Sequence, residues 1–397
     1  MEHEELAGWL RLQLTPGVGD ISARRLLTAF GLPEQIFSAS ASTLEQVVSS
    51  RQSAALQREP ETLQAQLKIT REWLQTAPEQ RRVITLGDAA YPQALLQTED
   101  PPLLLYATGA PEFWRDNAHA FATCLSRTLA IVGSRTPSTQ GLATARQISQ
   151  ELAQSGLTIV SGLALGIDGA AHEGALDGAP QGQLATIAVV GTGVDSVYPR
   201  QHLDLARRIA QRGILLGEYP LGTPPLATNF PKRNRIIAGL ARGTLVVEAA
   251  LRSGSLITAR LAAEQGKDVF AIPGPIHSAQ SRGCHALIKQ GARLVESAQD
   301  VLEEWQVDGR TRTMTANTTN TIAVPALPTV LDSTTGPNIA PDNELLNTLG
   351  FAPMGLDALQ ARTGLDTATL QARLMELELL GHITRLPGGL FQRMALA

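Results

Sequence analysis

The segment 229–235 concentrates three cations, Lys232, Arg233 and Arg235, together with two amides. An apolar run follows directly, so this cluster stands where a helix is expected to begin. Side chains of this charge cannot be buried without anionic partners, and the unpaired N–H groups of a helix N-terminus attract the same anions. Between 231 and 260, six Lys or Arg accompany a single acid, although the whole chain has a formal net charge of -4. The sequence therefore predicts a local anion site; a solvated helix face is the alternative.

Glycine- and serine-containing loops are expected after four of the buried strands. They span 133–138, 161–166, 191–193 and 252–255. Glycine and serine let backbone N–H groups approach an oxyanion, and Arg135 in the first loop can donate two parallel hydrogen bonds to a phosphate. In an open parallel sheet such loops share one edge, where ligands collect near the point at which strand order reverses. We therefore expect these loops and the basic cluster to form one phosphate-binding site.

Asp168 and His172 stand one helical turn apart and could form a proton-transfer pair or half of a metal site. The alternative is that Asp168 caps a helix while His172 hydrogen-bonds locally, and we favour it because no third ligand or nucleophile has an informative spacing. Cys124 and Cys284 are too few for a disulfide framework, and neither has a partner at metal-ligand spacing. The dinucleotide fingerprint after the first strand and the Walker-type phosphate loop are both missing. We expect no metal, no cofactor and no catalytic residue.

The elements that would position these residues are short apolar runs that alternate with helical segments. The runs span 83–86, 103–106, 129–132, 157–160, 187–190, 214–216, 245–247 and 269–272, with 293–295 as a possible edge strand. Strands that are apolar on both faces and separated by helices indicate a parallel sheet covered on both sides. We predict an extended, Rossmann-like, doubly wound α/β domain with a mostly parallel sheet over residues 81–305.

Two smaller regions are predicted on either side of this domain. Residues 1–80 have a helical pattern, and within them 14–27 resembles a helix-hairpin-helix element whose freed N–H groups could contact a phosphate; a purely structural turn is the alternative. Residues 306–341 are rich in Thr, Pro, Asn and Ala and are expected to form a flexible linker. Residues 342–397 have the order of a winged helix, but the expected recognition helix is net acidic, which favours a protein contact over DNA reading.

Composition limits the remaining possibilities. The chain begins with an acidic segment that lacks an apolar signal core, and no apolar run approaches the ~20 residues that cross a bilayer. We expect a cytoplasmic protein without a membrane segment. Aromatic residues make up only 4% of the chain, so any site that stacks bases must depend on very few rings. The segment 198–200, Tyr-Pro-Arg, is expected to be a rigid turn before a helix.

Four motifs together resemble the DNA-processing protein A family, also called DprA or Smf. They are IVGSR at 131–135, SGLALGID at 161–168, NFPKRNRII at 229–237 and SGSLITAR at 253–260. The helical N-terminal part, of SAM or helix-hairpin-helix type, and the C-terminal winged helix extend the similarity along the chain. The resemblance implies a protein that binds single-stranded DNA in natural transformation, protects the incoming strand, helps to load the RecA recombinase and forms a homodimer through its Rossmann-like domain.

The resemblance also implies a DNA site, carried over here onto the matching positions. It comprises Gly133, Ser134, Arg135, Ser161, Gly162, Lys232, Arg233, Asn234 and Arg235, with Ser253 and Gly254 added from the fourth motif. In our hypothesis the four cations of this set pair with successive phosphates while the glycine loops supply N–H contacts. Phe230 is the candidate stacking ring in a pocket too narrow for a duplex.

Two other functions stay open on sequence alone. A nucleotide-processing hydrolase on the same fold would hold one nucleotide in these loops and use Asp168, His172 or Glu248 for proton transfer. An adaptor that chiefly recruits a recombinase would depend on 342–397 and not on strand affinity. We expect a binding protein and not an enzyme.

Overall fold

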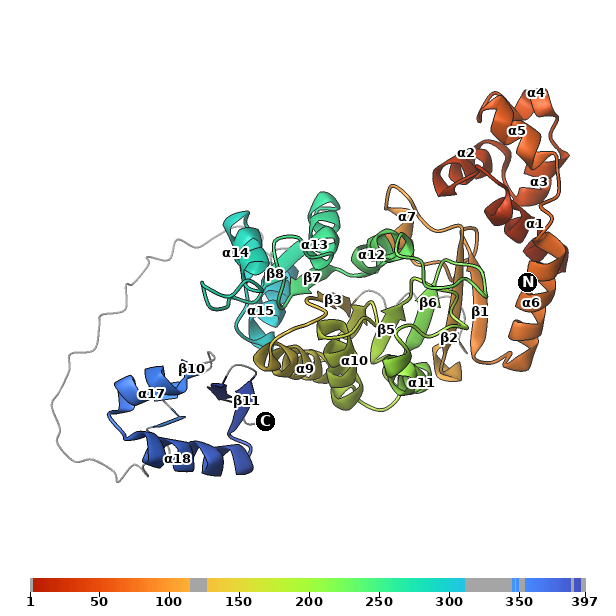
Figure 1. The fold of residues 1–397 in the computed structure, drawn as a ribbon. Coiled ribbons are helices and arrows are strands. Elements are labelled where there is room, and N and C mark those ends of the chain that lie inside the picture. The colour runs from red at the N-terminus through yellow and green to blue at the C-terminus, as the bar shows by residue number, and fades with distance from the viewer. Residues whose placement is uncertain are drawn as a thin grey trace. The chain divides into compact units, whose positions relative to one another are not determined.

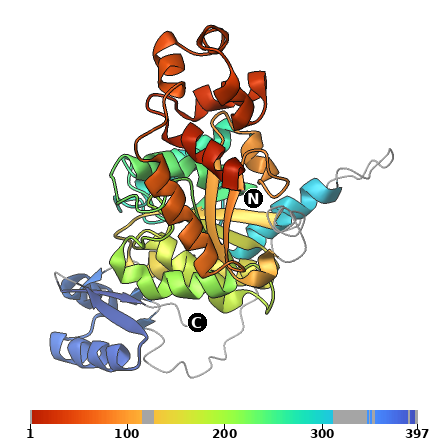
Figure 2. The ribbon, with the colours of Figure 1, turned by 90° about the vertical axis from the view of Figure 1, so that its right-hand side faces the viewer.

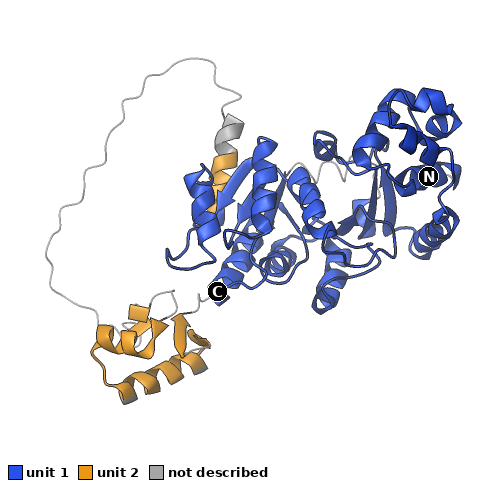
Figure 3. Cartoon of the chain, turned by 45° about the horizontal axis from the view of Figure 1, so that its top comes forward, with its two compact units in different colours: residues 1–298 blue, residues 299–397 orange. Residues whose placement is uncertain are grey.

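The computed structural model describes residues 3–114, 127–310, 345–346, 348–349, 354–386 and 389–393. The chain forms two compact units, residues 1–298 and 299–397, and each is described by itself (Figure 3). Cys124 and residues 311–341 of the expected linker lie outside the described residues. Helix α15 (Ala298–Arg310) continues through 306–310, where the linker was expected to begin.

Within the described residues, the first unit is built on a nine-stranded sheet of order β1-β2-β6-β5-β4-β3-β7-β8-β9 (Figure 1). Its strands are β1 (Arg81–Thr85), β2 (Leu104–Gly109), β3 (Thr128–Val132), β4 (Thr158–Ser161), β5 (Thr186–Val189), β6 (Ile214–Gly217), β7 (Gly243–Val246), β8 (Asp268–Ala271) and β9 (Arg293–Leu294). Strand β2 pairs antiparallel with β1 and β6, and the other pairings are parallel. The predicted mostly parallel sheet is confirmed, with each strand on one of the apolar runs.

Helices cover both faces of this sheet (Figures 1 and 2). One face carries α9 (Thr139–Gln154), α10 (Ile167–Gly178) and α11 (Leu203–Arg212), and the other carries α12 (Asn229–Leu240), α13 (Ser255–Glu264) and α14 (Arg282–Lys289). All residues of β3, β4, β5, β6 and β7 are buried, which explains why these strands are apolar on both faces.

The strand order reverses at β3. From β3 the chain continues to β4, β5 and β6 on one side, and it then returns to place β7, β8 and β9 on the other side. The connections that leave β3 and β7 therefore diverge and open a crevice at the carboxyl ends of these two neighbours. Ligands of open α/β sheets bind at such a reversal of strand order.

The N-terminal part of the first unit is helical, as predicted. It consists of α1 (His3–Leu14), α2 (Asp20–Phe30), α3 (Pro33–Ser38), α4 (Ala41–Leu44), α5 (Ser50–Leu56) and α6 (Leu63–Thr76). Leu12, Leu26 and Ile36 lie in a small core that also includes Leu103, the residue before β2. The turn between α1 and α2 contains Gly17 at φ 80°, a left-handed conformation that favours glycine.

The second unit has the predicted winged-helix order. It contains β10 (Met354–Gly355), α17 (Leu356–Thr363), α18 (Thr367–Leu379), β11 (Ile383–Leu386) and β12 (Leu390–Arg393), and its strands pair in the order β10-β12-β11. Leu370, Leu374 and Leu377 of α18 are buried in one core, as their spacing predicts. Across the described parts of both units, no helix is long and apolar enough to cross a membrane.

Candidate nucleic-acid interface

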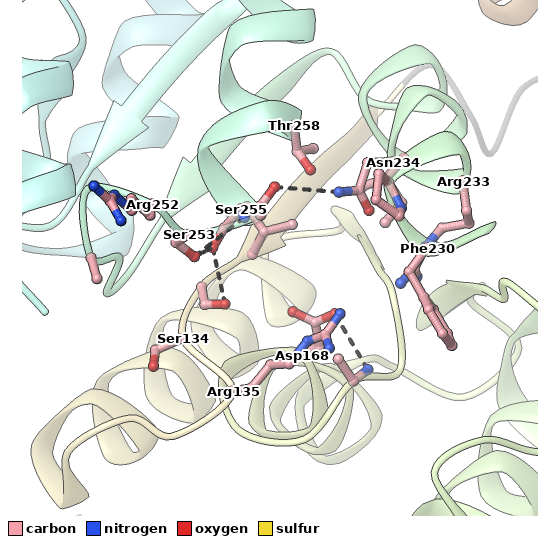
Figure 4. A pocket seen from close by; sticks show the side chains of 17 residues that line it. Ser134, Arg135, Asp168, Phe230, Arg233, Asn234, Arg252, Ser253, Ser255 and Thr258 are labelled. Atoms are coloured by element: carbon pink, nitrogen blue, oxygen red, sulfur yellow. Dashed lines mark hydrogen bonds between the residues drawn. The ribbon is translucent and has the colours of Figure 1, made fainter. Parts of the chain in front are cut away.

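A cavity of about 490 Å³ lies where the loops after β3 and β7 meet the start of α12 (Figure 4). The loop after β3 contributes 133–135, the first turns of α12 contribute Phe230, Pro231, Arg233 and Asn234, and the connection into α13 contributes 252–255. The side chains with hydrogen-bonding groups that line it are Ser134, Arg135, Asp168, Arg233, Asn234, Arg252, Ser253, Ser255 and Thr258. The cavity thus lies at the reversal of strand order, the position that the parallel sheet predicts for a ligand.

Hydrogen bonds between the three segments hold this cavity together (Figure 4). Ser255 Oγ donates to the Gly133 carbonyl at 3.1 Å, which joins the start of α13 to the loop after β3. Asn234 Nδ2 donates to the Gly254 carbonyl at 3.3 Å and so joins α12 to the same turn. The hydroxyl oxygens of Ser253 and Ser255 lie 2.5 Å apart. The N-terminus of α13, with its partial positive charge, is therefore fixed at the cavity wall.

Arg233 places a buried positive charge beneath the cavity. Its side chain is 3% exposed, and its guanidinium donates to the carbonyl of Val189 at the end of β5. Burial lowers the pKa of Arg233 to about 10, and the neighbouring Asp168 opposes this shift, so the group is charged near neutral pH. Only glycine fits opposite the guanidinium, because a Cβ on Gly162 would lie 2.5 Å from Arg233 Cζ.

Asp168 and His172 have separate structural roles, in agreement with the local hydrogen bonding that we favoured. Asp168 does not cap α10; its carboxylate accepts the N–H groups of Gly162 at 3.1 Å and Ala164 at 3.4 Å and holds the loop after β4. His172 Nδ1 lies 2.7 Å from Thr186 Oγ1 in the core, and burial lowers its pKa to about 3. Among the described residues, no group of three or more His, Cys, Asp or Glu could hold a metal ion.

Glu248, the third residue considered for proton transfer, supports a helix. Its carboxylate accepts hydrogen bonds from the Ser138 hydroxyl at 2.6 Å and from the Ser138 N–H at 2.9 Å, and Ser138 caps α9. A Cβ on Gly141 would lie 2.5 Å from the Glu248 carboxyl carbon, so α9 begins directly against it. Glu248 does not line the cavity. The hydrolase alternative therefore gains no proton donor or acceptor from Glu248 or His172.

Lys232 and Arg235 do not line the cavity, so the structure does not bring the four predicted phosphate partners together there. Lys232 Nζ lies 2.9 Å from Asp20 Oδ2 and 3.9 Å from Glu218 Oε2. Arg235 pairs with the same two carboxylates and with Asp100, whose Oδ2 lies 3.4 Å from Arg235 Nε. The anionic partners required by this part of the basic cluster thus come from the protein itself.

Ser161 and Gly162 lie below the cavity surface. Ser161 is fully buried, and its hydroxyl donates to the Ile131 carbonyl at 2.6 Å, which links β4 to β3. Gly162 lines a smaller pocket of about 80 Å³ that shares Arg135, Phe230 and Arg233 with the main cavity. Of the remaining predicted residues, Gly133, Ser134, Asn234, Ser253 and Gly254 line the main cavity.

Sequence reasoning did not include Arg252 among the site residues, although it lies on the cavity wall. The sequence could have predicted Arg252, since it begins the loop 252–255 and is one of the six cations between 231 and 260. Arg135, Arg233 and Arg252 now make up the basic lining, against one acid, Asp168. This lining suits a ligand that carries negative charge along its length.

Comparison with known proteins gives consistent similarities. The sequence model of the DNA recombination-mediator protein A family matches residues 82–306, and that of the DprA winged helix domain matches 332–389. Protein Smf of Escherichia coli is 42% identical over 306 residues, which cover 75% of this chain and 74% of that protein. DNA processing protein DprA of Streptococcus pneumoniae is 47% identical over 219 residues, which cover 55% and 72%. An X-ray structure of DprA from S. pneumoniae aligns with a TM-score of 0.60 at 36% identity and covers 77% of this chain and 98% of that chain.

Proposed function

Since the chain belongs to the DNA recombination-mediator protein A family (DprA/Smf), we propose that it binds single-stranded DNA in the cavity between the loops after β3 and β7. The observation that carries this proposal is the buried Arg233 guanidinium beneath a cavity whose rim bears Arg135, Arg252 and the N-terminus of α13. A fixed charge, two further arginines and helix N–H groups converge on one place, and phosphate is an anion that such donors bind well.

The dimensions of the cavity favour a single strand over a duplex. A volume of about 490 Å³ is typical of a site for one small ligand, and its walls are two loops and the first turns of α12. A flexible strand can bring one or two phosphates to such a site, whereas a rigid duplex cannot enter it. Phe230 on the wall is an apolar ring available to an unstacked base.

Binding is expected to be largely electrostatic and largely independent of sequence. If Arg135, Arg233 and Arg252 neutralise two or three phosphates, the log–log salt slope is about -1.4 to -2.1 for a single strand. The test is a salt-titrated binding curve for a labelled single strand and for its duplex, with wild type and Arg135→Ala. We expect about 10- to 100-fold weaker binding and a shallower slope for the variant.

The matched control is Arg207→Ala, an exposed arginine on α11 that pairs only locally with Asp204. This control should bind as the wild type does. A strand affinity that does not change in Arg135→Ala, or a salt response that is flat in the wild type, would remove the support for this site.

We further propose that the protein acts as a cytoplasmic homodimer that protects a transformed strand and helps to load a RecA recombinase. Membership of the family supports this role, and the relatives named DNA processing protein are consistent with it. Light scattering on the purified chain tests the dimer. Recombinase loading is tested by strand exchange on single strands coated with single-strand-binding protein, with Arg135→Ala expected to fail.

A further inference from the structure

An exposed tyrosine stands beside the proposed phosphate cavity. Tyr198 lies between β5 and the short helix η3 (Arg200–His202), and its side chain is 47% exposed. Its ring centroid lies 5.5 Å from that of Phe230, with the two rings inclined by 37°. The Arg135 guanidinium lies over the ring of Phe230, 5.8 Å from its centroid. Tyr198, Phe230 and Arg135 thus form a row with Phe230 in the middle, and Tyr198 is the one member that does not line the main cavity.

Phe230 is the supporting ring of this row. It packs closely on the backbone of the loop after β5, since a Cβ on Gly191 would lie 2.9 Å from Phe230 Cδ1. Tyr198 and Arg135 also contact it, so the Phe230 ring is partly covered, whereas Tyr198 is exposed. Tyr198 is at the outer end of the row and keeps about half of its surface in water. Among the described residues, the Tyr198 hydroxyl has no hydrogen-bond partner, so the ring is not held there for a polar contact.

The segments around Tyr198 are well anchored. Thr192 Oγ1 donates to the Ser196 carbonyl at 2.7 Å, which closes the loop ahead of the tyrosine. His202 Nδ1 lies 3.0 Å from the Leu163 carbonyl, which fastens η3 to the loop after β4. A platform that is in place before the ligand arrives loses little conformational entropy on binding.

The pocket beside Tyr198 combines apolar side chains with two arginines and shares part of its lining with the cavity. It has a volume of about 80 Å³ and lies between Tyr198, Leu165 and Phe230, and Arg135 and Arg233 border both this pocket and the larger one. Leu165 is 40% exposed, so two apolar side chains face water next to a basic site. At about 80 Å³ the pocket is too small to enclose a nucleotide, but the exposed ring of Tyr198 on its wall can stack on a base.

We propose that Tyr198 is the stacking surface for one unpaired nucleobase, whose neighbouring phosphate is held by Arg135. This inference rests on the proposed function and adds a base subsite to it. Every base has an aromatic face, so stacking on Tyr198 adds affinity without reading sequence. Because a base in a duplex is already stacked on both sides, the subsite also favours single strands.

The test compares Tyr198→Ala with Tyr198→Phe on a labelled oligothymidine and on the same strand with abasic sites throughout. Stacking is worth about 1–3 kcal/mol per base, so Tyr198→Ala should bind the normal strand about 5- to 150-fold more weakly, whereas Tyr198→Phe should stay near wild type. On the abasic strand, all three proteins should bind equally. The salt slope of Tyr198→Ala should match the wild type, because no phosphate contact is lost.

A 5-iodouracil strand gives a direct second measurement. Irradiation should cross-link it to the peptide that contains Tyr198. Normal affinity of Tyr198→Ala beside a weakened Arg135→Ala would overturn the base subsite and leave the DNA site standing. Equal losses of Tyr198→Ala on normal and abasic strands would show that the ring only supports the loop, which also overturns the proposal. If Arg135→Ala binds the strand normally, the proposed DNA site itself is overturned, and the base subsite that rests on it is overturned too.

Discussion

At the scale of single residues, the site depends on a glycine that makes room for an arginine. Gly162 faces the Arg233 guanidinium, and a Cβ there would lie 2.5 Å from Cζ. Gly162→Ala should therefore displace the guanidinium from the Val189 carbonyl and weaken strand binding by about tenfold or more. Overpacking of this kind should also lower the free energy of unfolding by about 1–3 kcal/mol.

The control for this change is Gly87→Ala, at a glycine with an ordinary backbone conformation where an added Cβ would meet only ordinary van der Waals contacts, the nearest 3.6 Å away on Trp9. Urea unfolding and the salt-titrated binding curve measure both effects. If the Gly162→Ala protein binds the strand with wild-type affinity, strand binding does not depend on the present position of the Arg233 guanidinium.

His172 gives a pH dependence of stability with a definite sign. Its pKa is lowered by burial to about 3, well below the ordinary value of 6.5, so the native state keeps the ring neutral while the unfolded state takes up a proton. The stability that depends on the neutral ring is present above pH 6.5 and is lost as the pH falls toward 3. Between pH 7 and pH 5, His172 should lower the free energy of unfolding by roughly 2 kcal/mol.

The variant His172→Gln should remove this part of the pH dependence. Thr186 Oγ1 donates to the Ile159 carbonyl at 2.7 Å, so it accepts the Nδ1–H of His172, and a glutamine amide offers a donor in its place. Urea unfolding at pH 7 and pH 5 should show a smaller difference for the variant than for the wild type. Equal differences in the two proteins would mean that His172 is accessible to protons in the native state.

At the scale of elements, the strands and their order were the predictable part of the fold. The runs of β3 to β7 are short, apolar on both faces and separated by helical segments, and this pattern is what distinguishes them from helices. The loops that follow parallel strands must share one edge, and this rule predicts that Gly133 and Ser253 line the same site, as they do.

The directions of the side chains on α12 were not predictable in the same way. Neighbouring positions on a helix point about 100° apart, so Lys232, Arg233 and Arg235 cannot all face one cavity. Which of them enters depends on carboxylates that lie far away in the sequence, Asp20 and Glu218. A dense cluster of cations indicates an anion site, but the tertiary partners decide how many of the cations serve it.

Helices α2 and α12 are linked by the ion pairs of Asp20, and this link can be tested. In Asp20→Asn, Lys232 loses its 2.9 Å partner, and a side chain that is 46% exposed becomes available to a phosphate. We expect tighter strand binding and a salt slope steeper by up to about 0.7. The unfolding free energy should fall by about 1–3 kcal/mol, because Arg235 is largely buried and loses one of its carboxylate partners.

Asp204→Asn is the matched control, since it removes an exposed ion pair with Arg207 on α11. That change should alter neither affinity nor stability measurably. If the Asp20→Asn protein is less stable but its salt slope is unchanged, the ion pairs of Asp20 only hold α2 against α12 and do not limit phosphate binding by Lys232.

At the scale of the whole molecule, strand binding and partner contact are expected to separate between the two units. The residues that line both pockets lie within 1–298, whereas α18 lies in the other unit and carries Glu376 and Glu378 beside Arg373. A net acidic helix is repelled by phosphates, so we expect α18 to contact protein.

A chain that ends at residue 310 should therefore keep the affinity and salt slope of the full chain within about twofold, since the sheet and its helices have a core of their own. In the full chain, Arg135→Glu should abolish strand binding, whereas Arg373→Glu should leave it unchanged, although both changes reverse one charge. Fluorescence titration of all four proteins with one labelled strand makes the comparison. A tenfold loss in the shortened chain, together with a loss in Arg373→Glu, would place part of the DNA contact on the winged helix and overturn its assignment to protein. If the shortened chain binds normally but no longer supports recombinase loading, the winged helix carries the partner contact.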